Sequence, residues 1–187
     1  ATVARNSSRL RVLVEDLLLV AAADSAEPTV GLVPLDLRQV IEASQETLAE
    51  LARHREDLQL RYDLPSTVVT VRGDAPSLER LIENLCSNAI KFTPEEGSVT
   101  VRLVQENAGA SLFVIDTGIG IDEAARSQLF KRFFRAPEAN SRAIPGSGLG
   151  LSVVQEILRQ HGGTIEIDSI PNEGTTVKVW LAAPDPA

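Results

Sequence analysis

Two asparagines and a lysine lie at helical spacing in the segment from Glu83 to Phe92. Asn84, Asn88 and Lys91 follow one another at four- and three-residue steps, so a helix would carry them on one face. An asparagine carbonyl is a hard oxygen ligand that suits Mg²⁺, which keeps several waters and also binds substrate phosphates, and a lysine beside it would meet a phosphate. A polar helix face in water is the plainer interpretation. Asparagine is a poor interior helix residue, however, and two of them on one face favour a binding role.

Two glycine-rich segments come later in the chain, and each alone is weak evidence for a ligand. Asp116 ends an apolar run and is followed by Gly118 and Gly120. Glycines let a backbone approach a ligand closely, although strand-end carboxylates are also common in plain turns and caps. The other segment, Gly146-Ser147-Gly148-Leu149-Gly150, stands directly before a predicted helix, where backbone amides and the helix dipole favour anions. No Lys-Ser or Lys-Thr follows its glycines, so it is not a P-loop.

The segment between them, Phe130-Lys131-Arg132-Phe133-Phe134-Arg135, combines three of the five phenylalanines with three cations. An amphipathic turn that docks its rings on the core would explain this composition. The polar residues 136–143 that follow have the composition that a lid over a ligand needs.

Alternating and helical patterns predict an α/β fold that positions these segments. Helices are predicted over residues 38–53, 75–92 and 149–160, and strands over residues 35–37, 58–62, 68–71, 99–104, 111–115, 164–167 and 176–181. Asp74 is the predicted N-cap of the middle helix, with Pro76 in its first turn. The expected architecture is a two-layer sandwich of a mixed sheet with helices on one face, preceded by one N-terminal helix.

The N-terminal helix is predicted from a narrow, coiled-coil-like apolar seam. Leu10, Leu13, Val14, Leu17 and Val20 recur at three- and four-residue steps. Such a helix could pack on the main domain, or it could belong to a helical hairpin whose other helix is missing, and the pattern alone leaves both open. Residues 26–34, with two prolines and a glycine, are predicted to be a linker.

The composition excludes several classes of protein. With 43% hydrophobic and 24% charged residues the chain is globular rather than collagen-like or disordered, and its longest apolar run is too short to cross a bilayer. A formal net charge of -8 repels nucleic acid, so no nucleic-acid partner is expected. Cys86 has no second cysteine to pair with and is expected to be a small core residue, which favours a reducing compartment.

Taken in this order, the four segments resemble the N, G1, F and G2 boxes of sensor histidine kinase catalytic domains, which have the Bergerat-type ATP-binding fold. The resemblance spans roughly Leu35 to Leu181 and extends to His161-Gly162-Gly163 and to Gly174-Thr175. The leading helix is similar to the second helix of that family's dimerisation hairpin. The implied organisation is a hairpin remnant over residues 1–25, a linker over 26–34 and a catalytic ATP-binding domain over 35–183.

ATP and Mg²⁺ are the ligands that the resemblance implies. Around the adenine, Asp116 would accept a hydrogen bond from the amino group, Thr175 would support it, and Phe92 would pack near the base. Gly118 and Gly120 would let the backbone approach the nucleotide. Guanine has a carbonyl oxygen where adenine has its amino group, and an acceptor that faces a carboxylate is strongly disfavoured.

Around the phosphates, the resemblance implies that Asn88 coordinates Mg²⁺ with help from Asn84. The cations that would neutralise phosphate charge are Lys91, Arg132 and Arg135, and the backbone amides that would contact the phosphates run from Gly146 through Ser147, Gly148 and Leu149 to Gly150. Phosphoryl transfer needs mainly positioning and electrostatics, so no protein nucleophile is expected in this domain. In the gyrase, MutL and heat-shock chaperone branches, a glutamate at the position of Asn84 activates water, so the amide here implies slow ATP hydrolysis.

The implied function is transfer of the ATP γ-phosphate to a histidine on a separate hairpin domain, with a response regulator downstream. The full-length parent would be a homodimer anchored in the membrane, with this domain in the cytoplasm. One alternative is an ATP-sensing module without transfer activity. Another is a serine-directed kinase of the anti-sigma type, a class that lacks the leading hairpin helix.

Several positions depart from the family's pattern. Neither His54 nor His161 has the family's acceptor context, so both are expected to be structural, and the chain is predicted to bind ATP without phosphorylating itself. Pro145 stands where a glycine is frequent and would stiffen the hinge of the lid. Val177 stands where the family usually has an aromatic residue, which changes packing rather than function.

Overall fold

The computed structural model describes residues 31–53, 55, 57–136, 144 and 146–184. The predicted N-terminal helix, most of the predicted linker and nearly all of the predicted lid lie outside this part, as do His54 and Pro145. The helices are α2 (Leu37–Arg53), α3 (Ala75–Phe92), α4 (Glu123–Arg126) and α6 (Gly150–His161). The strands are β1 (Val33–Asp36), β2 (Gln59–Asp63), β3 (Thr70–Gly73), β4 (Ser98–Glu106), β5 (Gly109–Asp116), β6 (Thr164–Ile170) and β7 (Gly174–Ala182).

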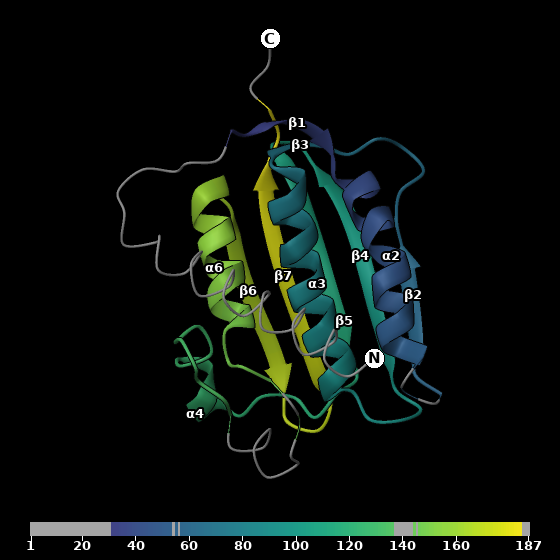
Figure 1. Cartoon of the computed structure of the whole chain (residues 1–187), viewed down its shortest axis with the longest axis vertical. Coiled ribbons are helices and arrows are strands. Elements are labelled where there is room, and N and C mark those ends of the chain that lie inside the picture. Colours follow the sequence, from purple (N-terminus) through teal and green to yellow (C-terminus); the bar gives the residue numbers. More distant parts are fainter. Residues whose placement is uncertain (1–30, 54, 56, 137–143, 145, 185–187) are drawn as a thin grey trace, which may run out of the picture.

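A five-stranded mixed sheet forms one layer of the molecule, in the order β2-β4-β5-β7-β6. β2 and β4 run parallel, and the remaining neighbours are antiparallel. α2, α3 and α6 lie side by side across one face of this sheet (Figure 1). The predicted two-layer α/β sandwich with helices on one face is therefore confirmed.

The core lies between the sheet and the central helix α3. Inward-facing Leu112, Val114 and Val179 are each at most 1% exposed, and α3 presents a buried apolar stripe to them. Burying such a side chain stabilises the fold by about 1.5–3 kcal/mol. Cys86 on α3 belongs to this core, as predicted, and burial raises the pKa of its thiol to about 12, so the thiol stays protonated.

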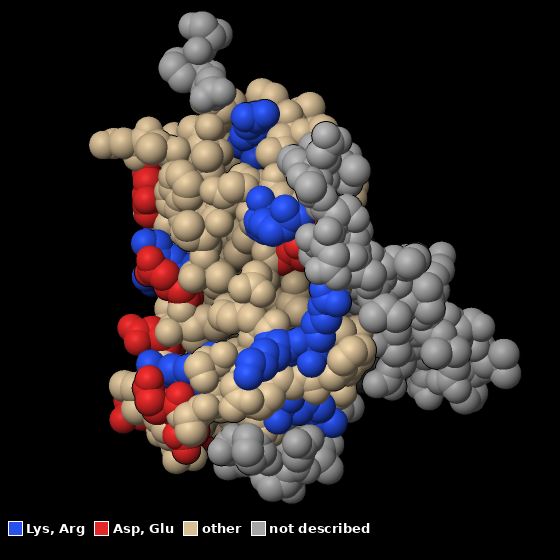
Figure 2. All heavy atoms as spheres, turned by 90° about the vertical axis from the view of Figure 1, so that its left-hand side faces the viewer, with Lys and Arg blue, Asp and Glu red and all other residues tan. Residues whose placement is uncertain are grey.

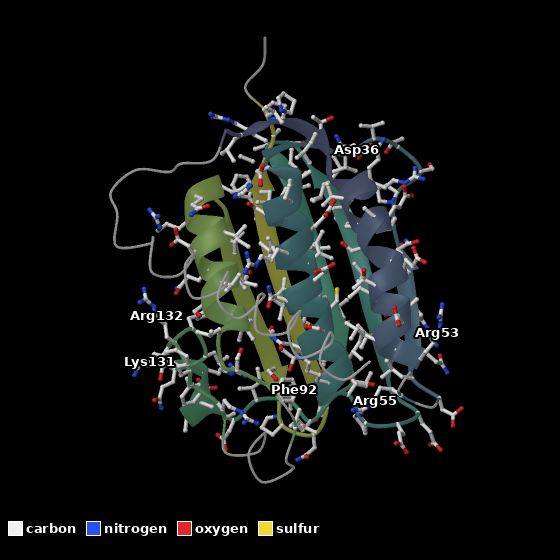
Figure 3. All side chains as sticks on the ribbon, viewed as in Figure 1. Asp36, Arg53, Arg55, Phe92, Lys131 and Arg132 are labelled. Atoms are coloured by element: carbon white, nitrogen blue, oxygen red, sulfur yellow. The ribbon has the colours of Figure 1, made fainter. Side chains whose placement is uncertain are left out.

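β1 and β3 form a separate two-stranded antiparallel sheet, which the sequence pattern did not reveal. The predicted strand at residues 68–71 begins at Thr70, because the pairing with β1 stops at Asp36. The Asp36 carboxylate (labelled in Figure 3) accepts hydrogen bonds from the backbone amides of Val69 and Arg38, both at 3.1 Å. The carboxylate thus pairs with the backbone just before the start of β3 and with the first turn of α2.

The start of α3 is fixed as the sequence predicted and is also tied to the end of α6. The Asp74 side chain accepts a hydrogen bond from the Ser77 amide at 3.0 Å, and a proline occupies the first turn. The Asp74 amide donates to Nε2 of His161 at 3.0 Å, so Nδ1 of that ring carries the proton and donates to the Ile157 carbonyl at 2.8 Å. Burial lowers the pKa of His161, which supports its structural role.

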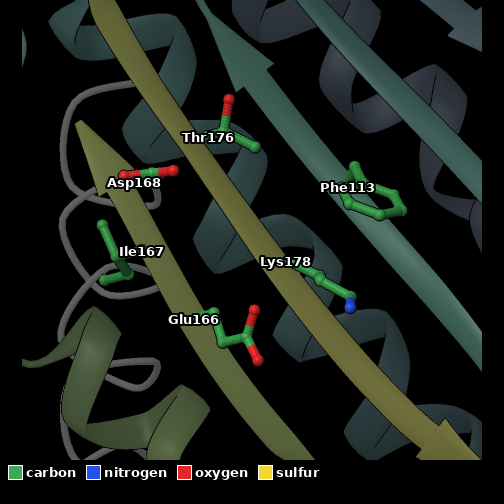
Figure 4. A pocket seen from close by; sticks show the side chains of 6 residues that line it. All are labelled: Phe113, Glu166, Ile167, Asp168, Thr176 and Lys178. Atoms are coloured by element: carbon green, nitrogen blue, oxygen red, sulfur yellow. The ribbon is translucent and has the colours of Figure 1, made fainter. Parts of the chain in front are cut away.

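The outer face of the sheet carries polar and charged side chains. Figure 4 shows this face with the helices behind the strands, where Phe113, Lys178 and Glu166 lie on three neighbouring strands. The Lys178 ammonium lies 5.9 Å from the centroid of the Phe113 ring. A hollow of about 340 Å³ opens here, lined by Phe113, Glu166, Ile167, Asp168, Thr176 and Lys178. None of the predicted site residues lines it.

Candidate functional site

The polar face of α3 meets the first turn of α6. Nδ2 of Asn84 donates to the Arg80 carbonyl at 2.8 Å, which directs Oδ1 away from that turn of the helix. A Cβ added at Gly150 would lie 2.9 Å from Asn84 Oδ1 and 3.7 Å from Asn88 Nδ2. The structure thus brings together two segments that the sequence singled out separately, and Lys91 is half-buried one turn further along α3.

The glycine segment before α6 is held against the phenylalanine segment. The Phe133 amide donates to the Gly148 carbonyl at 3.0 Å. Gly148 has a φ of +75°, and a Cβ there would lie 2.7 Å from the Phe133 carbonyl carbon. Leu149 is buried, whereas Gly146 and Ser147 are exposed. Leu149, the N-cap of α6, has no side-chain oxygen and makes no capping hydrogen bond, and the first amides of a helix that lacks such a cap can bind an anion. We call Asn84, Asn88 and the segment 146–150 the amide cluster.

The phenylalanine segment differs from its prediction at one ring. Phe130 and Phe134 are half-buried, but Phe133 is 62% exposed, so the three rings do not all dock on the core. The reason lies in the backbone, because Phe133 has a φ of +62° where the chain turns to meet Gly148. The ring therefore points outward.

Cations gather on the side of the molecule that carries α6. Figure 2 faces this side, where Lys and Arg atoms run down the middle and Asp and Glu atoms gather along one edge. Lys131 and Arg132 are exposed beside α6 (Figure 3). The Arg135 guanidinium donates to the Ile144 carbonyl, which joins the two ends of the predicted lid. The acidic domain thus has a local cationic surface next to the amide cluster.

Glu156 of α6 lies under this cationic surface, and the sequence did not single it out. It is 4% exposed, and its carboxylate accepts hydrogen bonds from Arg159 at 2.7 and 2.9 Å and from Gln160 at 2.9 Å. The hydrogen bonds from Arg159 are the main cause that lowers the pKa of Glu156, and the charge of Arg132 contributes. Glu156 therefore stays ionised and holds the Arg159 guanidinium in place.

Asp116 is a buried carboxylate at the end of β5. It is 9% exposed, and its Oδ1 accepts hydrogen bonds from the Gly118 amide at 2.8 Å and the Thr175 amide at 3.2 Å. Burial raises the pKa of Asp116 to about 6, and the two backbone hydrogen bonds oppose this rise. Both hydrogen bonds that Asp116 makes within the described part of the chain end on Oδ1, so Oδ2 is available to a ligand.

The end of α3 lies against the same carboxylate. A Cβ at Gly118 would lie 2.6 Å from Asp116 Oδ1 and 2.7 Å from the Phe92 carbonyl oxygen. The Ile119 amide donates to that Phe92 oxygen at 3.1 Å. Figure 3 shows Phe92 at the lower end of α3. We call Phe92, Asp116, Gly118 and Thr175 the carboxylate cluster.

Gly120 lies against the backbone at the end of β6. A Cβ there would lie 2.1 Å from the Ile170 carbonyl oxygen, in the turn that joins β6 to β7. The Asn172 amide of that turn donates to the Ile119 carbonyl at 2.8 Å. This packing accounts for a glycine at position 120 without a ligand.

Ser169 and Arg126 lie beside the carboxylate cluster, and the sequence pattern did not single them out. The Ser169 side chain is buried on β6, and its Oγ accepts a hydrogen bond from the Ile121 amide at 2.9 Å. The Arg126 guanidinium of α4 donates to the Ser169 carbonyl. The strand was predicted to end at Ile167, so a polar residue at the next inward-facing position, two residues on, was the signal that could have found Ser169.

Both clusters include residues from the second half of α3, where Asn88 and Phe92 are four residues and about 6 Å apart along the helix. The described part of the chain has no group of three His, Cys, Asp or Glu side chains that could hold a metal ion. A metal ion at the amide cluster would depend on asparagine oxygens and on oxygens of the ligand, a donor set that suits Mg²⁺. Among the described helices, none is long and apolar enough to cross a membrane.

Comparisons with known proteins agree on one family. Residues 73–185 match the family model described as "Histidine kinase-, DNA gyrase B-, and HSP90-like ATPase". The chain is 34% identical over 177 residues to the circadian input-output histidine kinase CikA of Synechococcus elongatus, which covers 94% of this chain and 24% of that protein. It is 41% identical over 155 residues to the signal transduction histidine-protein kinase/phosphatase MprB of Mycolicibacterium vanbaalenii, covering 80% of this chain and 31% of that protein.

A solved structure gives the same result. The structure of the mycobacterial sensor histidine kinase MprB superposes with a TM-score of 0.68 at 34% identity, and the match covers 82% of this chain and 98% of that one. The chain spans 24% and 31% of the length of the two curated relatives described above.

Proposed function

This chain belongs to the family of histidine kinase-, DNA gyrase B- and HSP90-like ATPases, and from that premise we propose that it is the ATP-binding catalytic domain of a sensor histidine kinase. In this proposal it transfers the γ-phosphate of ATP to a histidine on a separate hairpin domain. The parent protein would be a membrane-anchored homodimer that passes the phosphoryl group to a response regulator, with residues 1–25 as the remnant of its hairpin.

The buried carboxylate of Asp116 is the observation that carries the proposal. Its Oδ1 is engaged by two backbone amides, and its Oδ2 remains as a fixed acceptor at the end of β5. The adenine amino group supplies the donor that this acceptor needs, with the ring packed near Phe92. Guanine would turn a carbonyl oxygen toward the carboxylate and leave a buried acceptor unpaired, which costs more binding energy than a lost apolar contact.

The amide cluster fits the phosphates and their metal ion. Asn88 would hold Mg²⁺, and Asn84, whose Oδ1 points toward Gly150, would position it. The bound Mg²⁺ would neutralise charge on the phosphate oxygens. The uncapped amides at the start of α6 would contact the same phosphates, and Lys91, Arg132 and Arg135 would supply positive charge.

Asn84 also bears on the fate of the γ-phosphate. An amide cannot accept a proton from water at this position, and its Nδ2 is already committed to the Arg80 carbonyl. Slow hydrolysis would preserve the γ-phosphate until a histidine is presented. His161 cannot serve as that histidine in the folded domain, because it is buried and both ring nitrogens are hydrogen-bonded.

Calorimetric titration with Mg-ATP tests the adenine assignment. Asp116→Asn should weaken binding at least tenfold, about 1.4 kcal/mol, because the amide can present a donor to the adenine amino group. The matched control is Asp168→Asn, which removes the same charge from the exposed outer face. Unchanged affinity in Asp116→Asn, or an equal loss in both variants, would count against the assignment.

Transfer is tested by adding a separate hairpin domain that bears the acceptor histidine, together with radiolabelled ATP. Acid-labile label should appear on the added hairpin and not on this chain. Label only on a serine would favour the anti-sigma type of kinase, and ATP binding without any transfer would favour an ATP-sensing module. Stable, acid-labile label on the chain itself would overturn the prediction that it does not phosphorylate itself.

A further inference from the structure

Ser169 stands in a row of three polar side chains that crosses the sheet beneath the proposed adenine site. Asp116 of β5 is the register partner of Thr175 of β7, and Thr175 is the register partner of Ser169 of β6. Register partners in antiparallel strands point to the same face of a sheet, so all three side chains face the helix layer. Ser169 is 4% exposed and lies at the buried end of the row.

The Ser169 hydroxyl has three polar neighbours, each at 2.9 Å. These are the Ile121 amide, the Gly174 carbonyl and the Thr175 hydroxyl. A serine hydroxyl can donate one hydrogen bond and accept two. The Ile121 amide can only donate and the Gly174 carbonyl can only accept, so the single proton of Ser169 goes to Gly174.

The direction of the remaining hydrogen bond follows from this count. Because the Ser169 proton is already committed, the contact with Thr175 is a hydrogen bond only if Thr175 donates. The Thr175 hydroxyl then has no proton left, and its Oγ1 offers only lone pairs to other partners. This choice satisfies every group around Ser169, as buried polar groups require.

We propose that Ser169 is a specificity-determining residue that fixes Thr175 Oγ1 as a second hydrogen-bond acceptor at the adenine site, next to Asp116. This inference rests on the proposed function, because it assumes that the nucleobase lies at the carboxylate cluster. An adenine amino group has two protons, so Asp116 Oδ2 takes one and Thr175 Oγ1 takes the other, directly or through a water. Guanine offers an oxygen there and meets two fixed acceptors.

Without the Ser169 hydroxyl, the Thr175 hydroxyl can rotate and donate. Ser169→Ala should therefore weaken Mg-ATP binding about threefold and weaken Mg-GTP binding less or not at all, since a donor toward the guanine oxygen becomes available. The ratio of the GTP dissociation constant to the ATP dissociation constant should fall by up to about threefold, which is within the size of effect that one ordinary hydrogen bond produces. Both nucleotides are titrated by calorimetry under identical conditions.

A mutant cycle shows whether Ser169 acts through Thr175. In a Thr175→Val background, which removes the second hydroxyl, Ser169→Ala should leave the GTP-to-ATP ratio unchanged. If Ser169 had only a structural role, Ser169→Ala would weaken the binding of both nucleotides equally, in the wild type and in Thr175→Val. That result would overturn the inference. The matched control is Ser111→Ala, which removes a fully buried serine hydroxyl that bonds Glu106 on the same sheet, and it should leave the ratio at the wild-type value.

Two further measurements keep the result interpretable. Thermal melting establishes that each variant is folded at the titration temperature, and Ser169→Cys, with a similar size but a weaker donor and acceptor, should lower the ratio in the same direction if the alanine variant does not fold. Asp116→Asn is titrated alongside. If Asp116→Asn weakens ATP binding but the Ser169 variants keep the wild-type ratio, the Ser169 inference fails alone; if Asp116→Asn has no effect, the adenine site itself is misplaced.

Discussion

The carboxylate cluster and the amide cluster flank the same turns of α3, but they are built in opposite ways. The carboxylate cluster joins the end of α3 to the adjacent strands β5 and β7, and two backbone amides donate hydrogen bonds to its buried carboxylate. The amide cluster has exposed glycine and serine at one end and exposed cations beside it. In the proposed function, the rigid carboxylate cluster suits the adenine base, which does not change during the reaction. The more exposed amide cluster suits the phosphates, one of which is transferred.

The largest expected effect is on the stability of the folded domain, from a substitution next to the carboxylate cluster. Gly174→Ala should lower the free energy of unfolding by about 3 kcal/mol or more, because the new Cβ would lie 2.0 Å from the Asp116 carbonyl oxygen at a φ of +135°. Both obstacles are backbone and cannot give way. Urea denaturation measures the loss.

The matched control for that change lies in the amide cluster. Gly146→Ala meets no atom within 4 Å, so its free energy of unfolding should stay within about 0.5 kcal/mol of the wild type. Similar losses in both variants would remove the contrast between the clusters.

The next effect separates phosphate binding from base binding. Replacing Arg132 and Arg135 together by alanine should weaken Mg-ATP binding about tenfold, since charge-assisted contacts to phosphate oxygens are lost. Adenosine, which has no phosphates, should bind as before. Arg102→Ala on the outer face, where Arg102 pairs with Asp63 at 2.7 Å, is the control, and it should leave both affinities unchanged. Weaker adenosine binding in the double variant would contradict the assignment of these cations to the phosphates.

The stability of the fold and its affinity for adenosine should depend on pH in opposite directions, because both depend on the protonation of Asp116 in the carboxylate cluster. The folded-state pKa of Asp116 is raised from 3.8 to about 6, so its contribution to stability is fully present below the unfolded value and is lost as pH rises through about 6. The same protonation removes the acceptor for adenine, so adenosine affinity should fall several-fold as pH drops from 7 to 5.

Calorimetry with adenosine and urea denaturation across this pH range measure both trends, and Asp116→Asn should abolish both. Two trends of the same sign would mean that another group dominates.

The smallest expected effect lies where α6 meets α3. Gly150→Ala would place a Cβ 2.9 Å from Asn84 Oδ1, and the amide would have to turn aside. Mg-ATP affinity should fall about threefold, with adenosine affinity unchanged, as calorimetry can measure. Full Mg-ATP affinity would mean that Asn84 does not position the metal ion.

Local chemistry made part of this structure predictable. The Asp74 cap could be predicted because aspartate is a preferred N-cap residue and proline is common in the first turn of a helix. Both signals lie within a few residues of one another in the sequence. The order of the four polar segments gave the family. The exposed ring of Phe133 was not predictable in the same way, because its backbone conformation is imposed by Gly148, a distant partner.

Ser169 shows the same limit within the sheet. Its role depends on strand register, which aligns it with Thr175 and Asp116 across two strand pairs. Periodicity indicates which face a side chain takes but not which residue lies opposite. The small β1-β3 sheet escaped prediction for this reason as well.

The hydrogen bond between the Asp74 amide and His161 acts at the far ends of the two helices that carry the amide cluster. The start of α3 and the end of α6 are joined there through one neutral imidazole, at the opposite end of α6 from Gly150. Protonation would turn Nε2 from an acceptor into a donor facing another donor. Protonation of His161 in acid would therefore break the hydrogen bond between the start of α3 and the end of α6, while the hydrogen bonds within each helix would remain.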